Sequence, residues 1–508
     1  MRIYREEDRL RQVIAGAATV ISSFIFYYMT LAPTVTWGDP AKLSIFSYEL
    51  ILNHMPGYHS LHNLIGHFWG LIPFVDYAYG QNVLSAVFSS LTVGIIFIIT
   101  LKLTQSICSS VVSALVLAVS HSFWMFSVIN ESYSLMFFLI SLTLLQAIIW
   151  KKDNHLKQIF LVFFFLSLGV SNHYLSVIFI PAFIIYFLLV KPSLIRDWSF
   201  IIVVLLGGLL GSSLLLFILF HNNQLPFIQT RFSFFFNELV VGQINLFFIG
   251  SKKIGDEIIR YPAYLFYQFP GFGFFVGIFG IKKLLRQDPK LLLLFIMILF
   301  SVIIFSLGYQ YQRQFNLLTP SYVIFSIWIG IGFHQFEDYF FTGKKKIVLL
   351  TLALSVLLST PLTLYYSIPS ILRKFNYMPI KIRDIPYRNG IKYFLIPDKS
   401  DHYEALYFGN EVFRLVDNES VILGDFTTHE VLRYMQIING NKPEVILSTN
   451  YTLSYIQNVI DSGRSIYIIG NEIHPYYQRK YGITLNNLKS NYNFTQMGPI
   501  NRLTMKKL

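Results

Sequence analysis

The chain has 508 residues, of which 54% are hydrophobic and 17% aromatic but only 13% charged. Soluble domains carry about 25% charged residues, so this composition excludes an ordinary soluble protein and predicts an integral membrane protein. The formal net charge of +13 does not indicate nucleic acid, because the basic residues fall in short runs between apolar segments rather than on one face. A single cysteine, Cys108, excludes a disulfide framework and a cysteine-based metal site.

The apolar segments are long enough, or nearly so, to cross a membrane as helices. The first follows a basic stretch at 1–12, exceeds a signal-peptide core and lacks a clear cleavage site, so we expect a retained transmembrane helix. The segments number about eleven: 13–32, 82–101, 107–127, 133–150, 158–171, 174–190, 199–220, 263–281, 291–308, 317–335 and 347–367.

Basic residues recur in every second loop between these segments. With a cytoplasmic N-terminus, the inside loops contain Lys102, Lys151 to Lys157, Lys191 with Arg196, Lys282 to Lys290, and Lys344 to Lys346, as the positive-inside rule requires. An odd number of spans then places the chain after about 367 on the outer side. Residues 158–190 could form one broken helix instead of two spans, but the later basic loops would then lie outside.

We therefore expect a polytopic α-helical membrane domain at 1–367, with a long first outer loop at 33–81, and an extracytoplasmic α/β domain at 368–508. In the second region, strand-length apolar runs at 420–424, 444–448 and 465–470 alternate with helical patterns at 428–438 and 452–462. This alternation predicts a small, largely parallel sheet. No glycine-rich phosphate loop is present, so a lid or acceptor-recognition module is favoured over a nucleotide site.

The first outer loop opens with Asp39, in the stretch Thr34-Val-Thr-Trp-Gly-Asp-Pro40 directly after the first apolar segment. A carboxylate near the membrane is costly, about 2.5 to 3.5 kcal/mol at the bilayer centre and less near the interface, so such residues usually mark a substrate or ion site. An Asp before a Pro is also a good helix start. The two roles are compatible.

Other polar residues gather in the outer loops. Glu131 is the second acid at membrane depth, with pairing to a nearby His or Arg as its structural alternative. The loop also holds four histidines, His54, His59, His62 and His67, but the acidic and thiolate partners of a zinc site are not nearby, so a metal site is not favoured.

Arg313, preceded by Tyr309 and Tyr311, lies in a later outer turn. An Arg beside tyrosines suits a lipid-linked phosphate, which it can bind through charge and forked hydrogen bonds. An interfacial anchor is the alternative.

The run from Leu31 to Asp39, followed by His54 to Tyr58 and Leu64 to Gly66, resembles the multi-pass protein O-mannosyltransferase family of the GT-C glycosyltransferase superfamily. Later landmarks agree in order: Trp124, Asn130 to Tyr133, Gly169 to His173, Pro320 to Val323, Gly330 to Gly332, Arg388 with Asn389, and Val421 to Asp425. The resemblance implies many membrane helices, an active site at the outer face, and transfer of a sugar from a polyprenyl-phosphate carrier to a Ser or Thr hydroxyl of a protein.

By this resemblance, Asp39 is the catalytic acid and accepts the hydroxyl proton as the glycosyl-phosphate bond breaks. Glu131 is the second catalytic candidate, and a cation, either a side chain or a divalent metal ion, would hold the leaving phosphate. The candidate substrate-binding residues are Trp37, Lys42, His54, Tyr58, Asn172, His173, Tyr309 and Arg313.

Two motifs depart from the family pattern. Lys42 stands where the family has a second acid after the catalytic Asp, and His54-Met-Pro-Gly-Tyr-His59 replaces a His-Pro-Pro-Gly-Tyr-Pro run. Lys42 can instead neutralise the phosphate of the carrier.

Three alternatives remain open: a GT-C transferase with a lipid or polysaccharide acceptor, a transporter or flippase with a path through Asp39, Glu131 and His173, and a non-catalytic relative with Lys42 in place of an acid. The expected partners are a polyprenyl-phosphate-linked sugar, an acceptor protein and membrane lipids. High Ile, Asn, Lys, Phe and Tyr usage is typical of an AT-rich genome and favours a bacterial inner membrane over the endoplasmic reticulum.

Overall fold

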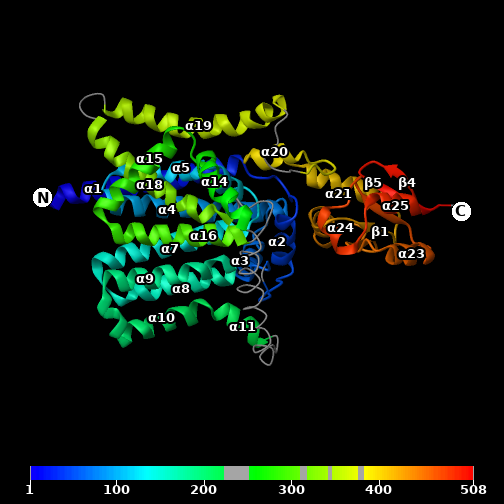
Figure 1. Ribbon diagram of the computed structural model, residues 1–508, viewed down its shortest axis with the longest axis horizontal. Helices are drawn as coiled ribbons and strands as arrows, with labels where there is room; N and C mark the ends of the chain where they lie inside the picture. Colours follow the sequence, from blue (N-terminus) through cyan, green and yellow to red (C-terminus); the bar gives the residue numbers. More distant parts are fainter. Residues whose placement is uncertain are drawn as a thin grey trace.

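The computed structural model describes the chain apart from residues 1, 56, 222–250, 309–316, 341–345, 376–382 and 507–508, and it leaves the side chains of 2–5, 251–259, 307–308, 338–340 and 346 undescribed. Long helices run side by side in a bundle, and a small mixed α/β domain lies beyond the end of the bundle that is opposite the N-terminus (Figure 1). We call this second part, residues 383–506, the outer domain, because it lies beyond the end of the helix bundle. A polytopic helical fold with a C-terminal sheet domain is thus confirmed.

The bundle helices and the short helices of its loops are α1 (Arg2–Met29), α2 (Asp39–Tyr48), α3 (Ser60–Trp69), α4 (Tyr77–Thr104), α5 (Ile107–Ala118), α6 (His121–Ser127), α7 (Ser132–Asp153), α8 (Leu156–Asn172), η1 (Tyr174–Phe179), α9 (Ile180–Val190), η2 (Pro192–Arg196), α10 (Trp198–Gly211), α11 (Ser213–His221), α14 (Ser251–Gln268), α15 (Phe272–Gln287), α16 (Pro289–Gly308), α18 (Thr319–Phe340) and α19 (Lys346–Lys374). The outer domain contains α20 (Gly390–Leu395), α21 (Glu404–Leu415), β1 (Val421–Leu423), α22 (Phe426–Ile437), β2 (Ile446–Ser448), α23 (Leu453–Asp461), β3 (Ile466–Ile469), α24 (Pro475–Tyr481), α25 (Leu485–Asn491), β4 (Tyr492–Met497) and β5 (Ile500–Met505).

Each of the eleven expected apolar segments falls on helix, but not each is a span by length and composition. In the described residues, five single helices are long and apolar enough to cross a membrane, and the number is eight if each of three bent pairs is one span. The single helices are α1, α4, α7, α16 and α19, and the bent pairs are α5 with α6, α10 with α11, and the end of α14 with α15.

The bend between α5 and α6, 71°, shows how a break in a membrane helix is tolerated. Backbone groups freed by such a break must find partners, since lipid offers none. The His121 amide donates to the Tyr365 hydroxyl (3.0 Å), and the Ser122 amide donates to the Gln268 side chain (2.9 Å). Side chains from distant helices therefore bind the backbone groups at the bend, and for this reason the bend could not be predicted from the sequence of 107–127 alone.

The segment 158–190 forms two helical stretches, α8 and then η1 with α9, rather than one broken helix. The α-helix α8 ends at Asn172, and His173 has an extended backbone (φ −148°, ψ 121°) before the 3-10 turn η1. Packing separates the two halves as well, because α8 packs against α7 and α10 whereas α9 packs against α16.

Among the described parts of the chain, the expected inside loops that follow α4, α7, α9 and α15 lie at the end of the bundle that carries the N-terminus (Figure 1). Lys102 and Lys151 lie in the last turns of α4 and α7, and Lys151 forms an ion pair with Asp288 just before α16. Lys344 and Lys345 lie outside the described residues.

The five-stranded sheet of the outer domain has the order β2-β1-β3-β5-β4. Its first three strands are parallel and are the three runs predicted from the sequence. Strands β4 and β5 add an antiparallel hairpin that was not predicted from the sequence. Strand β4 has several exposed polar residues and no continuous apolar run, so it gives no clear strand signal. The sheet is therefore mixed rather than largely parallel.

The first outer loop and the outer domain share one apolar core. Trp37 and Phe46 of the loop are buried in the same cluster as Phe408 and Val431 of the outer domain, and α2 packs along α22. The Tyr434 hydroxyl also accepts a hydrogen bond from the backbone amide of Ala78 at the start of α4 (3.2 Å). This contact holds the outer domain over the end of the bundle.

Helices α15 and α18 pack backbone to backbone, which gives a test of the bundle. A Cβ at Gly280 would lie 1.8 Å from the Trp328 carbonyl oxygen, whereas a Cβ at Gly273 of the same helix would meet its nearest atom at 3.6 Å. We expect Gly280→Ala to lower stability by about 1–3 kcal/mol through overpacking and Gly273→Ala to be neutral or slightly stabilising. Thermal unfolding of the purified variants measures this, and equal melting temperatures would contradict the packing.

Candidate functional site

An extended segment joins α1 to α2 and carries the candidate residues. The Ala32 amide donates to the Val128 carbonyl (3.0 Å), and the Asn82 side chain donates to the carbonyls of Ala32 (2.9 Å) and Thr34 (3.3 Å). Within this segment Trp37 is 5% exposed and packs its ring against Phe408 at 5.2 Å. The connection is thus fixed by polar contacts on the bundle side and by apolar contacts on the outer side.

Asp39 is the first residue of α2, and Gly38 rather than Asp39 occupies the N-cap position. Gly38 has φ 79° and ψ −121°, a backbone conformation that is essentially restricted to glycine. The Asp39 side chain is exposed, although Trp37, Gly38 and Pro40 around it are buried. Asp39 does begin a helix, as expected, but Gly38 rather than Asp39 takes the N-cap position. The Asp39 carboxylate lies at the surface where the loop meets the outer domain.

Lys42 lies one helical turn after Asp39, in a cage of aromatic rings. Its ammonium is 5.2 Å from the ring centre of Phe46, 5.6 Å from that of Tyr58 and 5.8 Å from that of Phe426 in α22. It also donates to the Gly57 carbonyl (3.0 Å). Rings and carbonyl hold the charge in place without cancelling it, since none of these groups is an anion.

A chain of hydrogen bonds ties α2, α3 and the start of α7 together. The Asn130 side-chain nitrogen Nδ2 donates to the Ser44 hydroxyl (3.0 Å), and the Asn130 side-chain oxygen Oδ1 is 2.9 Å from His62 Nε2. All three side chains are buried. Asn130 therefore orients the loop relative to α7, and Glu131 follows it directly.

Glu131 occupies the N-cap position of α7 with an extended backbone, and its side chain does not cap the helix. The residue is half-buried. Its amide donates to the Ser85 hydroxyl of α4 (3.3 Å), which fixes its backbone. The structure thus places the second acid at the same end of the bundle as α2 and α3.

His173 and Asn172 face the loop from the end of α8. His59 Nδ1 is 2.8 Å from the Asn172 carbonyl oxygen, and the His59 ring is 5.0 Å from the His173 ring. The Tyr133 ring is 5.1 Å from His173 on another side. Tyr174 donates its hydroxyl hydrogen to the His54 carbonyl, so both parts of the predicted His54-to-His59 motif contact this segment.

The four loop histidines do not form a metal cluster. His59 bonds to Asn172, His62 to Asn130 and His67 to the Ser47 carbonyl (2.9 Å), and His59 has a left-handed backbone before α3, so it does not share a helical face with His62. In the part of the chain that the structure describes, no group of three or more His, Cys, Asp or Glu side chains could hold a metal ion.

Two outer-domain residues at this junction were not assigned to the site from the sequence. Phe426 faces Lys42, and the Arg388 guanidinium lies 5.9 Å from the Trp37 ring centre, beside Tyr393 and Phe394. No local signal marks Phe426, because its role depends on a contact between segments almost 400 residues apart. Tyr309 and Arg313 lie outside the described residues.

The pH dependence of protein stability tests whether His62 is buried as the structure shows. Burial, the largest cause, lowers the pKa of His62 from 6.5 to about 4, and the Asn130 contact only partly opposes this. Because the folded pKa is lower than the unfolded one, stability is fully present above pH 6.5 and falls as the pH approaches 4. Between pH 7 and pH 5 we expect His62 to account for a loss of about 2 kcal/mol.

The measurement is thermal unfolding at both pH values for the wild type and for His62→Gln, which keeps a hydrogen-bonding side chain without titrating. We expect the pH-induced loss to shrink in this variant and to persist in His155→Gln, a change at the exposed start of α8. An unchanged loss in His62→Gln would contradict the assignment.

The first part of the chain is similar to a known protein family. Residues 39–195 match the family described as the protein O-mannosyl-transferase TMEM260 N-terminal domain. The protein O-mannosyl-transferase TMEM260 of Mus musculus is 29% identical over 126 residues, which are 25% of this chain and 18% of the mouse protein. The match thus spans less than a fifth of that relative.

The whole chain resembles solved membrane proteins in fold. The structure of ArnT from Cupriavidus metallidurans bound to undecaprenyl phosphate has a TM-score of 0.53 at 10% identity, covering 97% of both chains, and its apo form has 0.54 at 11% identity with the same coverage. The Archaeoglobus fulgidus oligosaccharyltransferase in complex with Zn and sulfate has a TM-score of 0.50 at 10% identity, over 90% of this chain and 67% of that one.

These similarities agree with the resemblance drawn from the loop motifs, and the matched region begins at Asp39 and includes Lys42, Glu131 and His173. Residues 39–195 of this integral membrane chain therefore match the protein O-mannosyl-transferase TMEM260 N-terminal domain, and the whole chain has a fold similar to that of ArnT.

Proposed function

We propose that this chain is a membrane glycosyltransferase that transfers a sugar, mannose or another hexose, from a polyprenyl-phosphate carrier to Ser or Thr hydroxyls of an acceptor protein. The observation that carries the proposal is the position of Asp39, an exposed carboxylate in an otherwise buried segment where the bundle meets the outer domain. The TMEM260 match over 39–195 supports a protein O-mannosyl-transferase reaction, and the undecaprenyl phosphate bound to ArnT supports a polyprenyl-phosphate donor.

In the proposed reaction, the hydroxyl oxygen of the acceptor attacks the anomeric carbon of the sugar. The bond from that carbon to the phosphate oxygen breaks, its electron pair stays with the carrier phosphate, and the hydroxyl proton passes to the Asp39 carboxylate. A hydroxyl is a weak nucleophile, so a positioned base speeds this step. Phosphate is a good leaving group and needs charge stabilisation more than protonation.

Lys42 is the residue that we assign to the leaving phosphate. It lies one turn from Asp39 on α2, and the contacts that the described residues make with its ammonium come from rings and one carbonyl rather than from a carboxylate. A lysine at this position therefore supports a catalytic rather than a non-catalytic relative. Glu131 is the second candidate acid, and the remaining substrate contacts are assigned to Trp37, His54, Tyr58, Asn172, His173, Tyr309 and Arg313.

We further propose that the site faces the extracytoplasmic side of a bacterial inner membrane. The basic residues at the N-terminal end of the bundle support this orientation, since Asp39 lies at the opposite end. In this proposal, residues 1–367 are the membrane domain and 368–508 are the extracytoplasmic domain.

Asp39→Asn tests the catalytic assignment. We expect transfer to fall about 10²- to 10⁴-fold, the usual contribution of a general base, with little change in stability because the side chain is exposed. The assay uses purified protein, a panel of polyprenyl-phosphate sugars and host envelope proteins, read by intact mass. Glu49→Gln, an exposed carboxylate just after the other end of α2, is the matched control, and full activity in Asp39→Asn would refute the role.

Lys42→Met tests the phosphate assignment, because Met keeps an apolar stem within the ring cage and removes the charge. Loss of one charge-assisted contact, about 1.5–3 kcal/mol, predicts a 10- to 100-fold fall in kcat/KM for the donor. Lys489→Met, which removes an exposed lysine 5.9 Å from the Phe494 ring, is the control. A normal kcat/KM in folded Lys42→Met would show that the lysine only holds the loop in place.

A further inference from the structure

The outer domain contains a cavity of about 350 Å³ that the proposed reaction does not use. It opens at the carboxyl ends of the parallel strands β1 and β3. Asp425 follows β1 by two residues, and Gly470, Asn471 and Glu472 follow β3 directly. In open α/β sheets, ligands bind outside the carboxyl ends of the strands where the strand order changes direction, and the order β2-β1-β3 places that point between β1 and β3.

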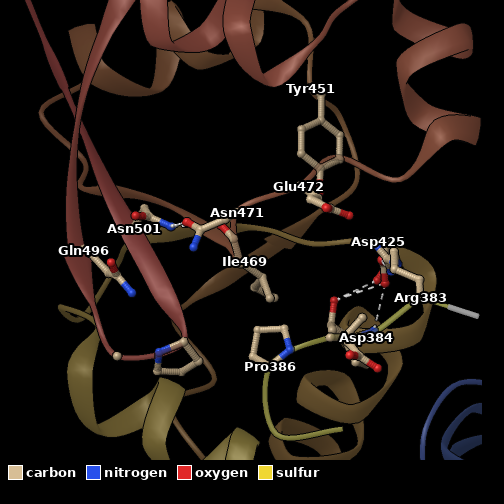
Figure 2. A pocket seen from close by; sticks show the side chains of 15 residues that line it. Arg383, Asp384, Pro386, Asp425, Tyr451, Ile469, Asn471, Glu472, Gln496 and Asn501 are labelled. Carbon is tan, nitrogen blue, oxygen red and sulfur yellow. Dashed lines mark hydrogen bonds and ion pairs between the residues drawn. The ribbon is translucent and has the colours of Figure 1, made fainter. Parts of the chain in front are cut away.

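Three separate parts of the chain wall this cavity. Figure 2 shows the hairpin residues Gln496 and Asn501 on one side, Pro386 below, and Arg383 with Asp425 on the far side. The walls are connected, because the Gly470 amide donates to the Pro499 carbonyl (2.9 Å) and the Asn501 side chain donates to the Gly470 carbonyl (2.8 Å). The cavity is therefore built by the tertiary fold and is not a gap beside one loop.

The charges in the cavity select against anions. Its lining has three carboxylates, Asp384, Asp425 and Glu472, and one cation, Arg383, which forms an ion pair with Asp425. Although burial of Asp425 acts in the opposite direction, Arg383 holds the pKa of this carboxyl below its usual range. The lining thus carries a net charge of −2 (one positive, three negative), which disfavours phosphates and nucleotides.

The remaining polar groups suit hydroxyls. Asn471, Gln496 and Glu472 are exposed side chains at the rim, and together they offer both donors and acceptors. Within the described residues, Gln496 and Glu472 make no side-chain hydrogen bond, so both are available to a ligand. A volume of about 350 Å³ lies at the lower end of the range of ligand pockets, about 300–1,000 Å³, and fits one or two sugar rings rather than a long chain.

We propose that this cavity is a saccharide-binding site for a neutral hexose or a short neutral glycan. Glu472, Gln496 and Asn471 bind the hydroxyls, while Ile469, Pro386 and Tyr451 provide the apolar walls. The proposal does not depend on sugar transfer, since binding in this cavity involves neither Asp39 nor Lys42. The sugar is either free or attached to a glycosylated peptide, and the test separates these sources.

The experiment measures equilibrium binding to full-length protein in phosphatidylcholine nanodiscs, which avoids detergents with sugar head groups. The probes are radiolabelled mannose, glucose, N-acetylglucosamine, dimannose and a peptide carrying one O-linked mannose, with the unglycosylated peptide, inorganic phosphate and an organic amine as comparisons. All proteins carry Asp39→Asn, so that loss of transfer cannot be mistaken for loss of binding. We expect saturable binding of at least one neutral sugar probe.

The variants locate the site. Glu472→Gln and Gln496→Ala each remove one contact, and we expect each to weaken binding about threefold to tenfold. Glu444→Gln is the control, because it removes one negative charge, as Glu472→Gln does, at an exposed position just before β2, the edge strand opposite β4. We expect this variant to bind the sugar probes as the wild type does. Binding of the mannosylated peptide but not of free sugars assigns the site to a glycosylated acceptor.

Three results would overturn the proposal: no saturable binding of any neutral sugar probe, equal binding by the Glu472 and Gln496 variants and the wild type, or binding of phosphate or amine alone. Thermal unfolding of each variant checks that the outer domain is folded. Because the exposed side chains of Glu472 and Gln496 make no hydrogen bond within the described residues, we expect unchanged melting temperatures for both variants.

Discussion

Hydrogen bonding of an extended backbone at the end of a membrane helix is the constraint on which the rest of this structure depends. Where α1 ends, the backbone is no longer helical, and on the bundle side no water is present to bind its free N–H and C=O groups. Each such group costs several kcal/mol if it has no hydrogen-bond partner. Asn82, Val128 and the backbone amide of Lys399 supply the partners. The segment that carries Trp37 and Asp39 can therefore be both irregular and fixed.

This fixed segment also explains why the outer domain has a defined place. Trp37 closes an apolar core whose other half comes from α21 and α22, and Arg388 covers the ring from the outer side. The contact buries apolar surface from regions that are distant in sequence, which is the main favourable term in such docking. Loop and outer domain thus form one unit around the exposed Asp39 carboxylate.

Much of the fold could be predicted from the sequence because apolar length and strand alternation are local signals. These signals predicted the three parallel strands β1, β2 and β3 and the helix α23. They also predicted the helical character of all eleven apolar segments. The bend between α5 and α6 did not, since its backbone is completed by Tyr365 and Gln268 from other helices. The β4–β5 hairpin was missed because β4 is polar on its exposed face.

The candidate site divides in the same way. Asp39 is recognisable in the sequence as an acid directly after a membrane segment. Lys42 and the His54-to-His59 motif are recognisable through the family resemblance, and the roles of all these residues remain predictions. The Phe426 contribution to the Lys42 cage and the cavity beside Asp425 both depend on contacts between distant segments. No periodicity or local motif encodes such contacts, so they become visible only once the chain is folded.

The buried Lys399 has a consequence for how a large substrate reaches Asp39. Its amide bonds to the carbonyl of Thr30 at the end of α1 (3.0 Å), and the residue is fully buried. Swinging the outer domain away as a lid would break this bond and expose the lysine together with Trp37. In the proposed reaction, the carrier and the acceptor would therefore have to reach Asp39 while the outer domain remains bound to the end of α1.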